Sequence, residues 1–79
     1  MENLTQKSIE QYFADFNITD PDVKAKILPE VTAIIYDRNL LVVQAEKEDD
    51  EYKKQQITND VAEMDKTIEE TFKDFIKEQ

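Results

Sequence analysis

The side chains that could do chemistry in this sequence are almost all carboxylates. There are 19 Asp and Glu residues but no His and no Cys. Ser8 and the threonines therefore have no imidazole base that could activate them as nucleophiles. Zinc and the other metals that bind through imidazole or thiolate lack their ligands for the same reason. We therefore expect a protein that is not an enzyme and that uses no cofactor.

The carboxylates themselves are suitable ligands for Mg²⁺ or Ca²⁺, and their densest run is Asp49-Asp50-Glu51. A calcium-binding EF-hand loop needs spaced oxygen ligands around a glycine, whereas this run is contiguous and the chain contains no glycine. Acid–base catalysis by a carboxylate pair needs a cleft, which a small helical bundle seldom forms. The sequence therefore predicts neither a metal site nor a catalytic site.

The net charge of −9 restricts the partners of the chain. Nucleic acid and anionic membranes attract clustered Lys and Arg, so we expect direct binding to neither. The most apolar stretch is interrupted by Asp37 and Arg38, which argues against a transmembrane helix, and the N-terminus lacks the basic and apolar regions of a signal peptide. We expect a soluble, cytoplasmic protein, and a host or a mobile-element origin would look the same in this sequence.

The acidity also has a functional interpretation. Small acidic proteins, among them several phage-encoded inhibitors, mimic the charge of DNA and occupy nucleic-acid-binding surfaces. The candidate acidic face consists of Glu46, Glu48, Asp49, Asp50 and Glu51, with Glu63, Glu69, Glu70 and Asp74 further along. Lysines are interspersed among these acids, as on any solvated helix. An inhibitory face and an ordinary charged surface both remain open.

A short segment near the N-terminus has a specific pattern: a glutamine, an aliphatic residue three positions later, and two aromatic residues after a further two. These residues are Gln6, Ile9, Tyr12 and Phe13. The segment resembles the PIP box by which eukaryotic and archaeal proteins dock on the sliding clamp. The resemblance implies that the last three residues form a hydrophobic plug and that the glutamine fills a polar pocket. An amphipathic helix that packs in a core has the same spacing, and Phe16 continues the stripe.

Residues 28–45 form the one apolar block of the chain. Read as a helix, the block has a first apolar face and, beside it, a second row at three- and four-residue steps. That second row consists of Ala33, Tyr36, Leu40 and Val43. The alternative is a β-hairpin at 31–44, with strands at 31–36 and 40–44, which the β-branched residues favour. We favour the helix, because the turn lacks glycine and both faces of each strand would be apolar.

The rest of the chain predicts helices that cover this block. Residues 5–17 form an amphipathic segment for which Thr5 is a plausible N-cap. Pro21 suits a first helical turn, and an interior Pro29 predicts a short helix at 21–27 and a second one from 29. The last helix begins near Asp60 or near Asp49. Since there is no glycine for turns, we predict one domain, 1–79, that is all-α: a small bundle of three to four helices with a buried central helix. An α+β fold around the hairpin is the alternative.

The second apolar row links this fold to a function. If the other helices cannot bury both rows of the central helix, the row from Ala33 to Val43 becomes a face for self-association or for a protein partner. The sequence therefore predicts a non-catalytic protein–protein interaction or assembly module that forms homo-oligomers. The alternative is an acidic, DNA-mimic-like inhibitor of a nucleic-acid-processing protein, which could dock on a sliding clamp through residues 6–13.

Overall fold

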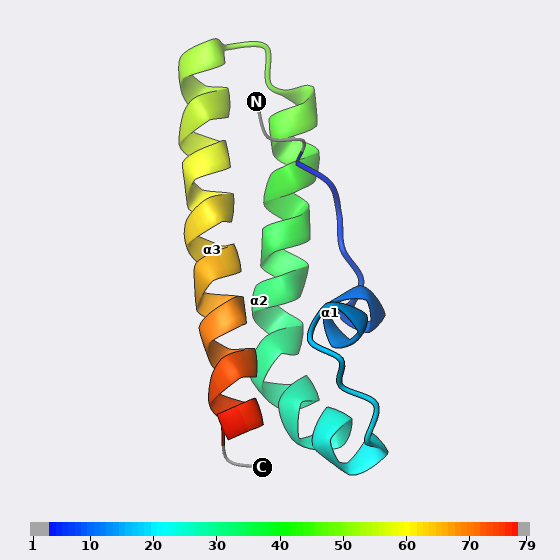
Figure 1. The fold of residues 1–79 in the computed structure, drawn as a ribbon. Helices are drawn as coiled ribbons and strands as arrows, with labels where there is room; N and C mark the ends of the chain where they lie inside the picture. The colour runs from blue at the N-terminus through cyan, green and yellow to red at the C-terminus, as the bar shows by residue number, and fades with distance from the viewer. Residues whose placement is uncertain (1–3, 78–79) are drawn as a thin grey trace.

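A computed structural model describes residues 4–77, and they form three helices with no strand among them. The helices are α1 (Ile9–Asp15), α2 (Pro21–Lys47) and α3 (Glu51–Lys77). Helices α2 and α3 form a long antiparallel hairpin, and α1 lies beside its lower half (Figure 1). The all-α bundle predicted from the sequence is therefore confirmed, whereas the β-hairpin at 31–44 is not supported, because those residues lie within α2.

Helix α1 is shorter than predicted because its N-cap is Ser8 rather than Thr5. The Ser8 hydroxyl accepts a hydrogen bond from the backbone N–H of Gln11, and the Gln11 side chain accepts one from the backbone N–H of Ser8. This capping box satisfies two backbone donors at once. The helix stops where Asn17 adopts a positive φ of 57°, a conformation that asparagine tolerates better than most residues.

Helix α2 runs without a break through Pro29, so the prediction of a separate helix at 21–27 was wrong. Asp20 caps its start by accepting from the backbone N–H of Asp22 at 2.9 Å. The first turns of α2 diverge from the axis of the rest, as expected of a proline-containing helix (Figure 1). The helix persists because Pro29 is exposed, while Ile27 and Val31 on either side are fully buried and fix both halves to the core.

Helix α3 begins at Glu51, which favours the earlier of the two predicted starts over Asp60. The Asp50 carboxylate accepts from the backbone N–H groups of Tyr52 and Lys53, at 2.9 and 3.3 Å. Asp50 is therefore the N-cap of the helix, and its negative charge favours the positive end of the helix dipole.

The core lies where all three helices meet, around the fully buried ring of Phe72 on α3. Three aromatic rings of the α1 region surround it: Phe16 stacks at 4.9 Å between centroids, Tyr12 stacks at 5.9 Å, and Phe13 meets it edge-on at 5.9 Å. Helix α2 is the central helix, since it packs on both others. Its burial is one-sided, however, because its two neighbours cover only one part of its circumference.

Candidate functional site

The second apolar row of α2 faces away from the core. We call Ala33, Tyr36, Leu40 and Val43 the α2 row. Tyr36 is 64% exposed and Leu40 is 44% exposed, whereas Val31 and Val42 on the core face of the same helix are completely buried. Ala33 is also exposed and Val43 is half-buried. The sequence-derived condition for an association face, an apolar row that the bundle leaves uncovered, is thus met.

The α2 row continues toward the N-terminal end of the helix. At 100° per residue, exposed Ala25 and Pro29 fall on the same arc of about 80° as the four residues of the row. The charged residues of this part of the helix lie outside that arc: Lys26, Glu30 and Asp37 at its side, and Arg38 on the core face. In a chain that is 37% charged, an uncharged helical face that extends from residue 25 to residue 43 is a distinct feature of the surface.

The five acids of the predicted acidic face lie together at the connection between α2 and α3. We call residues 46–51 the acidic tip. Asp50 caps α3, and Glu48 accepts from the backbone N–H of Asp50 at 3.1 Å, so two of the five carboxylates stabilise the connection itself. Glu46, Asp49 and Glu51 are exposed. The further acids Glu63, Glu69, Glu70 and Asp74 are also exposed, on α3.

The PIP-like segment packs into the core rather than projecting from it. Tyr12 and Phe13 are only 3% and 2% exposed, and both rings contact Phe72. Ile9 is half-buried and Gln6 is exposed, in the extended stretch before α1. In this fold the aromatic pair is not available as a plug, since docking on a clamp would require α1 to leave the bundle.

A partly buried polar network around Arg38, which the sequence analysis missed, joins α2 to α3 and to the N-terminal segment. The guanidinium of Arg38 donates to the Asp65 carboxylate, with Nε 2.8 Å from Oδ1, and also to the backbone carbonyl of Thr5. Asn39 accepts from the backbone N–H of Lys7 at 3.0 Å and donates to its carbonyl at 2.8 Å. Helical spacing places Arg38 on the core face of α2 and Asp65 on the core face of α3. Two opposite charges at core-facing positions of different helices were the signal in the sequence that could have predicted this ion pair.

Tyr12 completes this network by donating from its hydroxyl to Asp65 Oδ1 at 3.2 Å. Burial raises the pKa of the Tyr12 phenol from its ordinary value of 10.0 to about 12. The positive charge of Arg38 opposes this shift, while the carboxylate of Asp65 adds to it. The network is structural in character, because the ring of Tyr12 lies in the core and its hydroxyl is held between α1 and α3.

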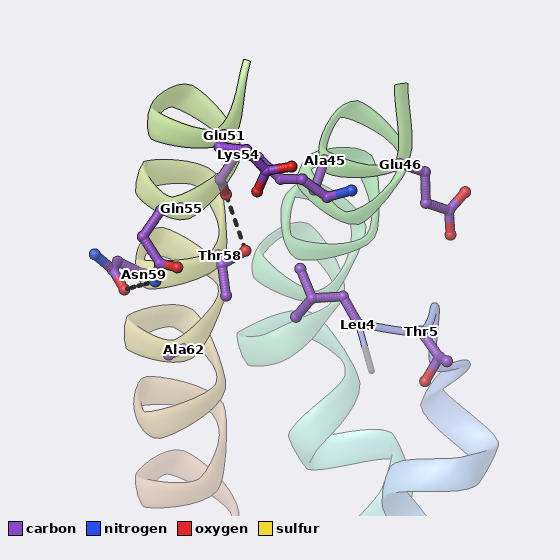
Figure 2. Close-up of a pocket in the computed structure, with 10 residues that line it drawn as sticks. All are labelled: Leu4, Thr5, Ala45, Glu46, Glu51, Lys54, Gln55, Thr58, Asn59 and Ala62. Atoms are coloured by element: carbon purple, nitrogen blue, oxygen red, sulfur yellow. Dashed lines mark hydrogen bonds between the residues drawn. The ribbon is translucent and has the colours of Figure 1, made fainter. Parts of the chain in front are cut away.

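A groove of about 690 Å³ lies near the acidic tip, above the part of the hairpin that α1 covers. Figure 2 shows Leu4 directed toward the two long helices and the Lys54 side chain extending from α3 toward Ala45 of α2. Glu46 and Glu51 also line the groove, and its remaining border consists of Thr5 and of uncharged side chains of α3. Within residues 4–77 no group of three or more acidic, His or Cys side chains is placed to hold a metal ion.

Comparisons of the chain with protein-family models, with curated proteins and with solved structures gave no match. Among the helices that the structure describes, none is both long and apolar enough to cross a membrane. Function is therefore inferred from the residues of the chain itself, and the α2 row is the candidate site.

Proposed function

We propose that the protein is a non-catalytic interaction module that self-associates through the α2 row. The observation that carries this proposal is the exposure of Tyr36 and Leu40 at the centre of an uncharged helical face. Tyrosine is enriched at the energetic centres of protein interfaces, because its ring supplies a large contact area at a low cost in conformational entropy. Leu40 lies one helical turn further along the same face and supplies an adjoining apolar contact.

The dimensions of the molecule suit a second copy as the partner. Its longest extent is 44 Å, and the uncharged face of α2 from residue 25 to residue 43 runs along about 27 Å of helix at 1.5 Å per residue, so a second copy can lie along most of one side. In a two-fold symmetric interface the same surface of both copies is in contact, so that surface must be complementary to itself. An apolar row meets this requirement, because two such rows bury apolar side chains against each other. Charged residues at the side of the row, such as Asp37, would form a solvated rim.

The test compares two variants that each add one negative charge. Leu40→Asp places a carboxylate in the middle of the α2 row, and Gln56→Asp places one on the exposed surface of α3. A dimer of Leu40→Asp would bury two unpaired carboxylates, so we expect at least about 100-fold weaker association. Light scattering after size exclusion should then give a mass near 9.3 kDa, while Gln56→Asp should behave like the unchanged protein.

Circular dichroism separates association from folding. Leu40 is already exposed on the single chain, so Leu40→Asp should keep the helical signal of the unchanged protein. Loss of helicity would mean that the row belongs to the core of one molecule, and the proposal would fail. Tyr36→Ser, which removes the ring without adding charge, should weaken association as well. An unchanged mass for both row variants would also overturn the proposal.

The second candidate, an acidic inhibitor, predicts a different response to salt. An interface between the acidic tip and a basic partner would weaken steeply as ionic strength rises. Self-association through an apolar row would not. Two of the five carboxylates of the acidic tip, those of Glu48 and Asp50, already stabilise the connection and the start of α3, so self-association is the function that this geometry favours.

A further inference from the structure

We infer that the second copy docks antiparallel, with a two-fold axis that crosses α2 between Ala33 and Tyr36. This inference rests on the proposed self-association and specifies its geometry. It follows from two independent features of the described chain: the order of large and small residues along the uncharged face of α2, and the distribution of charge between the two ends of that helix.

The uncharged face has small residues in one half and large residues in the other. Toward the N-terminal end it presents Ala25, Pro29 and Ala33, and toward the C-terminal end Tyr36, Leu40 and Val43. A two-fold axis between Ala33 and Tyr36 pairs residues whose numbers are equally far from it in opposite directions. Two large residues then meet small ones of the other copy: Tyr36 meets Ala33 and Leu40 meets Pro29. Val43 comes opposite residue 26, one position from Ala25 on the uncharged face.

This pairing gives the shape complementarity that packed interfaces need. Large and small side chains on facing positions interdigitate, whereas large against large holds the helices apart and leaves gaps between the small ones. A parallel arrangement would place Tyr36 against Tyr36 and Ala33 against Ala33. The antiparallel arrangement is therefore the one in which large residues meet small ones and fill the space between the helices.

The charge distribution favours the same arrangement. The acidic tip carries five carboxylates and Lys47, a net charge of −4, while residues 20–26 at the other end of α2 carry Asp20, Asp22, Lys24 and Lys26, a net charge of zero. Parallel docking would place the two acidic tips side by side, within a Debye length of about 8 Å to 10 Å, where like charges are poorly screened. Antiparallel docking instead places each tip near the neutral N-terminal end of α2 in the other copy.

The distance between the tips in the antiparallel dimer removes their repulsion. At a rise of 1.5 Å per residue, Asp49 lies about 20 Å along the helix from the axis, so the two tips lie about 40 Å apart. That separation is several Debye lengths at physiological salt. Opposed helix dipoles add a smaller contribution of the same sign, because the positive end of each α2 then lies beside the negative end of the other.

The absence of cysteine from the chain allows a direct test by disulfide cross-linking. Ala25→Cys and Val43→Cys variants are prepared separately, and each is oxidised alone and after mixing with the other. In the antiparallel dimer residue 25 of one copy lies within one residue, about 1.5 Å along the helix, of the position opposite residue 43 of the other, while two residues at position 25 are about 30 Å apart. A disulfide needs Cα atoms within about 7 Å, so a covalent dimer should form in the mixture and at under a tenth of that yield in either variant alone.

Each other outcome overturns a separate part of the inference. A covalent dimer in each variant alone shows parallel docking, so the antiparallel geometry fails while self-association stands. A dimeric mass without any cross-link shows that another face is used, so the antiparallel geometry and self-association through the α2 row both fail. A monomeric mass refutes the proposed function itself. Gln56→Cys, on exposed α3, gives the background yield from random collisions.

Discussion

Arg38 is the residue whose role is least like that of its neighbours in sequence. Its side chain is 6% exposed on a helix face that otherwise buries apolar residues, and it reaches Asp65, Thr5 and Asn39. A buried ion pair adds little net stability, because desolvation of the two charges offsets their attraction. The pair specifies how the helices pack, because only one register of α3 on α2 brings Asp65 to Arg38. The Arg38 guanidinium also holds the N-terminal segment in place through the carbonyl of Thr5.

Removal of one partner of this pair should be costly. We expect Asp65→Ala to lower the free energy of unfolding by about 2 kcal/mol, because it leaves the Arg38 guanidinium without its counter-charge. The cost should be smaller than for a fully buried pair, since the Asp65 side chain retains 34% exposure. Urea denaturation measures it. Glu69→Ala, an exposed acid of the same helix, should change stability by less than about 0.5 kcal/mol.

A double-mutant cycle shows whether the two effects are one interaction. Arg38→Met combined with Asp65→Ala should lower the free energy of unfolding by clearly less than the sum of the two single changes, because the double variant contains neither charge and so leaves no unpaired charge in the core. Additive costs would contradict the coupling between Arg38 and Asp65.

Tyr12 makes stability dependent on pH in the alkaline range. Burial raises its pKa in the folded state to about 12, from the ordinary value of 10.0. A raised pKa means that the folded state holds the proton more tightly, so this contribution is complete below pH 10 and is lost as the pH rises toward 12. The loss is on the order of 1 to 2 kcal/mol, because the hydroxyl lies at the edge of the core and is partly screened by solvent.

Urea denaturation at pH values from 9 upward tests this expectation. The free energy of unfolding should fall more steeply with pH for the unchanged protein than for Tyr12→Phe, which keeps the ring and removes the ionisable hydroxyl. Parallel curves for the two proteins would show that Tyr12 does not carry the effect.

At the scale of elements, Pro29 sets the course of α2. It removes one backbone hydrogen bond inside the helix, and its ring crowds the carbonyl of Ala25. We expect Pro29→Ala to raise the free energy of unfolding by about 1 to 2 kcal/mol, less than the full cost of an interior proline, because proline also restricts the unfolded chain. The measurement is best made in the Leu40→Asp background, where association should not contribute. A loss of stability would show that the bend itself is needed for packing.

The elements also show what the sequence could and could not predict. The helical nature of residues 28–45 and the existence of a second apolar row on α2 follow from periodicity and from side-chain chemistry. The continuity of α2 did not, because the cost of Pro29 is local while the burial of Ile27 and Val31 that outweighs it is tertiary. Ser8 was overlooked as the α1 cap because Thr5 satisfies the same local rule.

At the scale of the whole molecule, one long hairpin and one short helix cannot enclose α2. Helix α1 covers only the lower half of the hairpin (Figure 1). Helix α2 is therefore covered where it contacts α1 and α3, and its α2 row is left exposed to solvent. From the sequence alone the number of covering helices was open, and with it the exposure of Tyr36 and Leu40. The Arg38–Asp65 pair was equally hidden, since its two members are 27 residues apart and meet only after the hairpin has closed.

The net charge of −9 on each copy should shape the association. Two such molecules repel each other at long range, while the contact between their α2 rows is apolar and insensitive to salt. Added salt screens the repulsion. We therefore expect self-association to strengthen several-fold between about 50 and 300 mM NaCl, the opposite of the response of an interface formed by the acidic tip.

Sedimentation equilibrium of the unchanged protein, over a range of protein and salt concentrations, is the most direct test of self-association through α2. The average mass should rise with protein concentration from 9.3 kDa toward twice that value, and it should do so at lower protein concentration when salt is high. A mass that stays at 9.3 kDa up to about 1 mM protein, where even contacts of about 4 kcal/mol become populated, would contradict it.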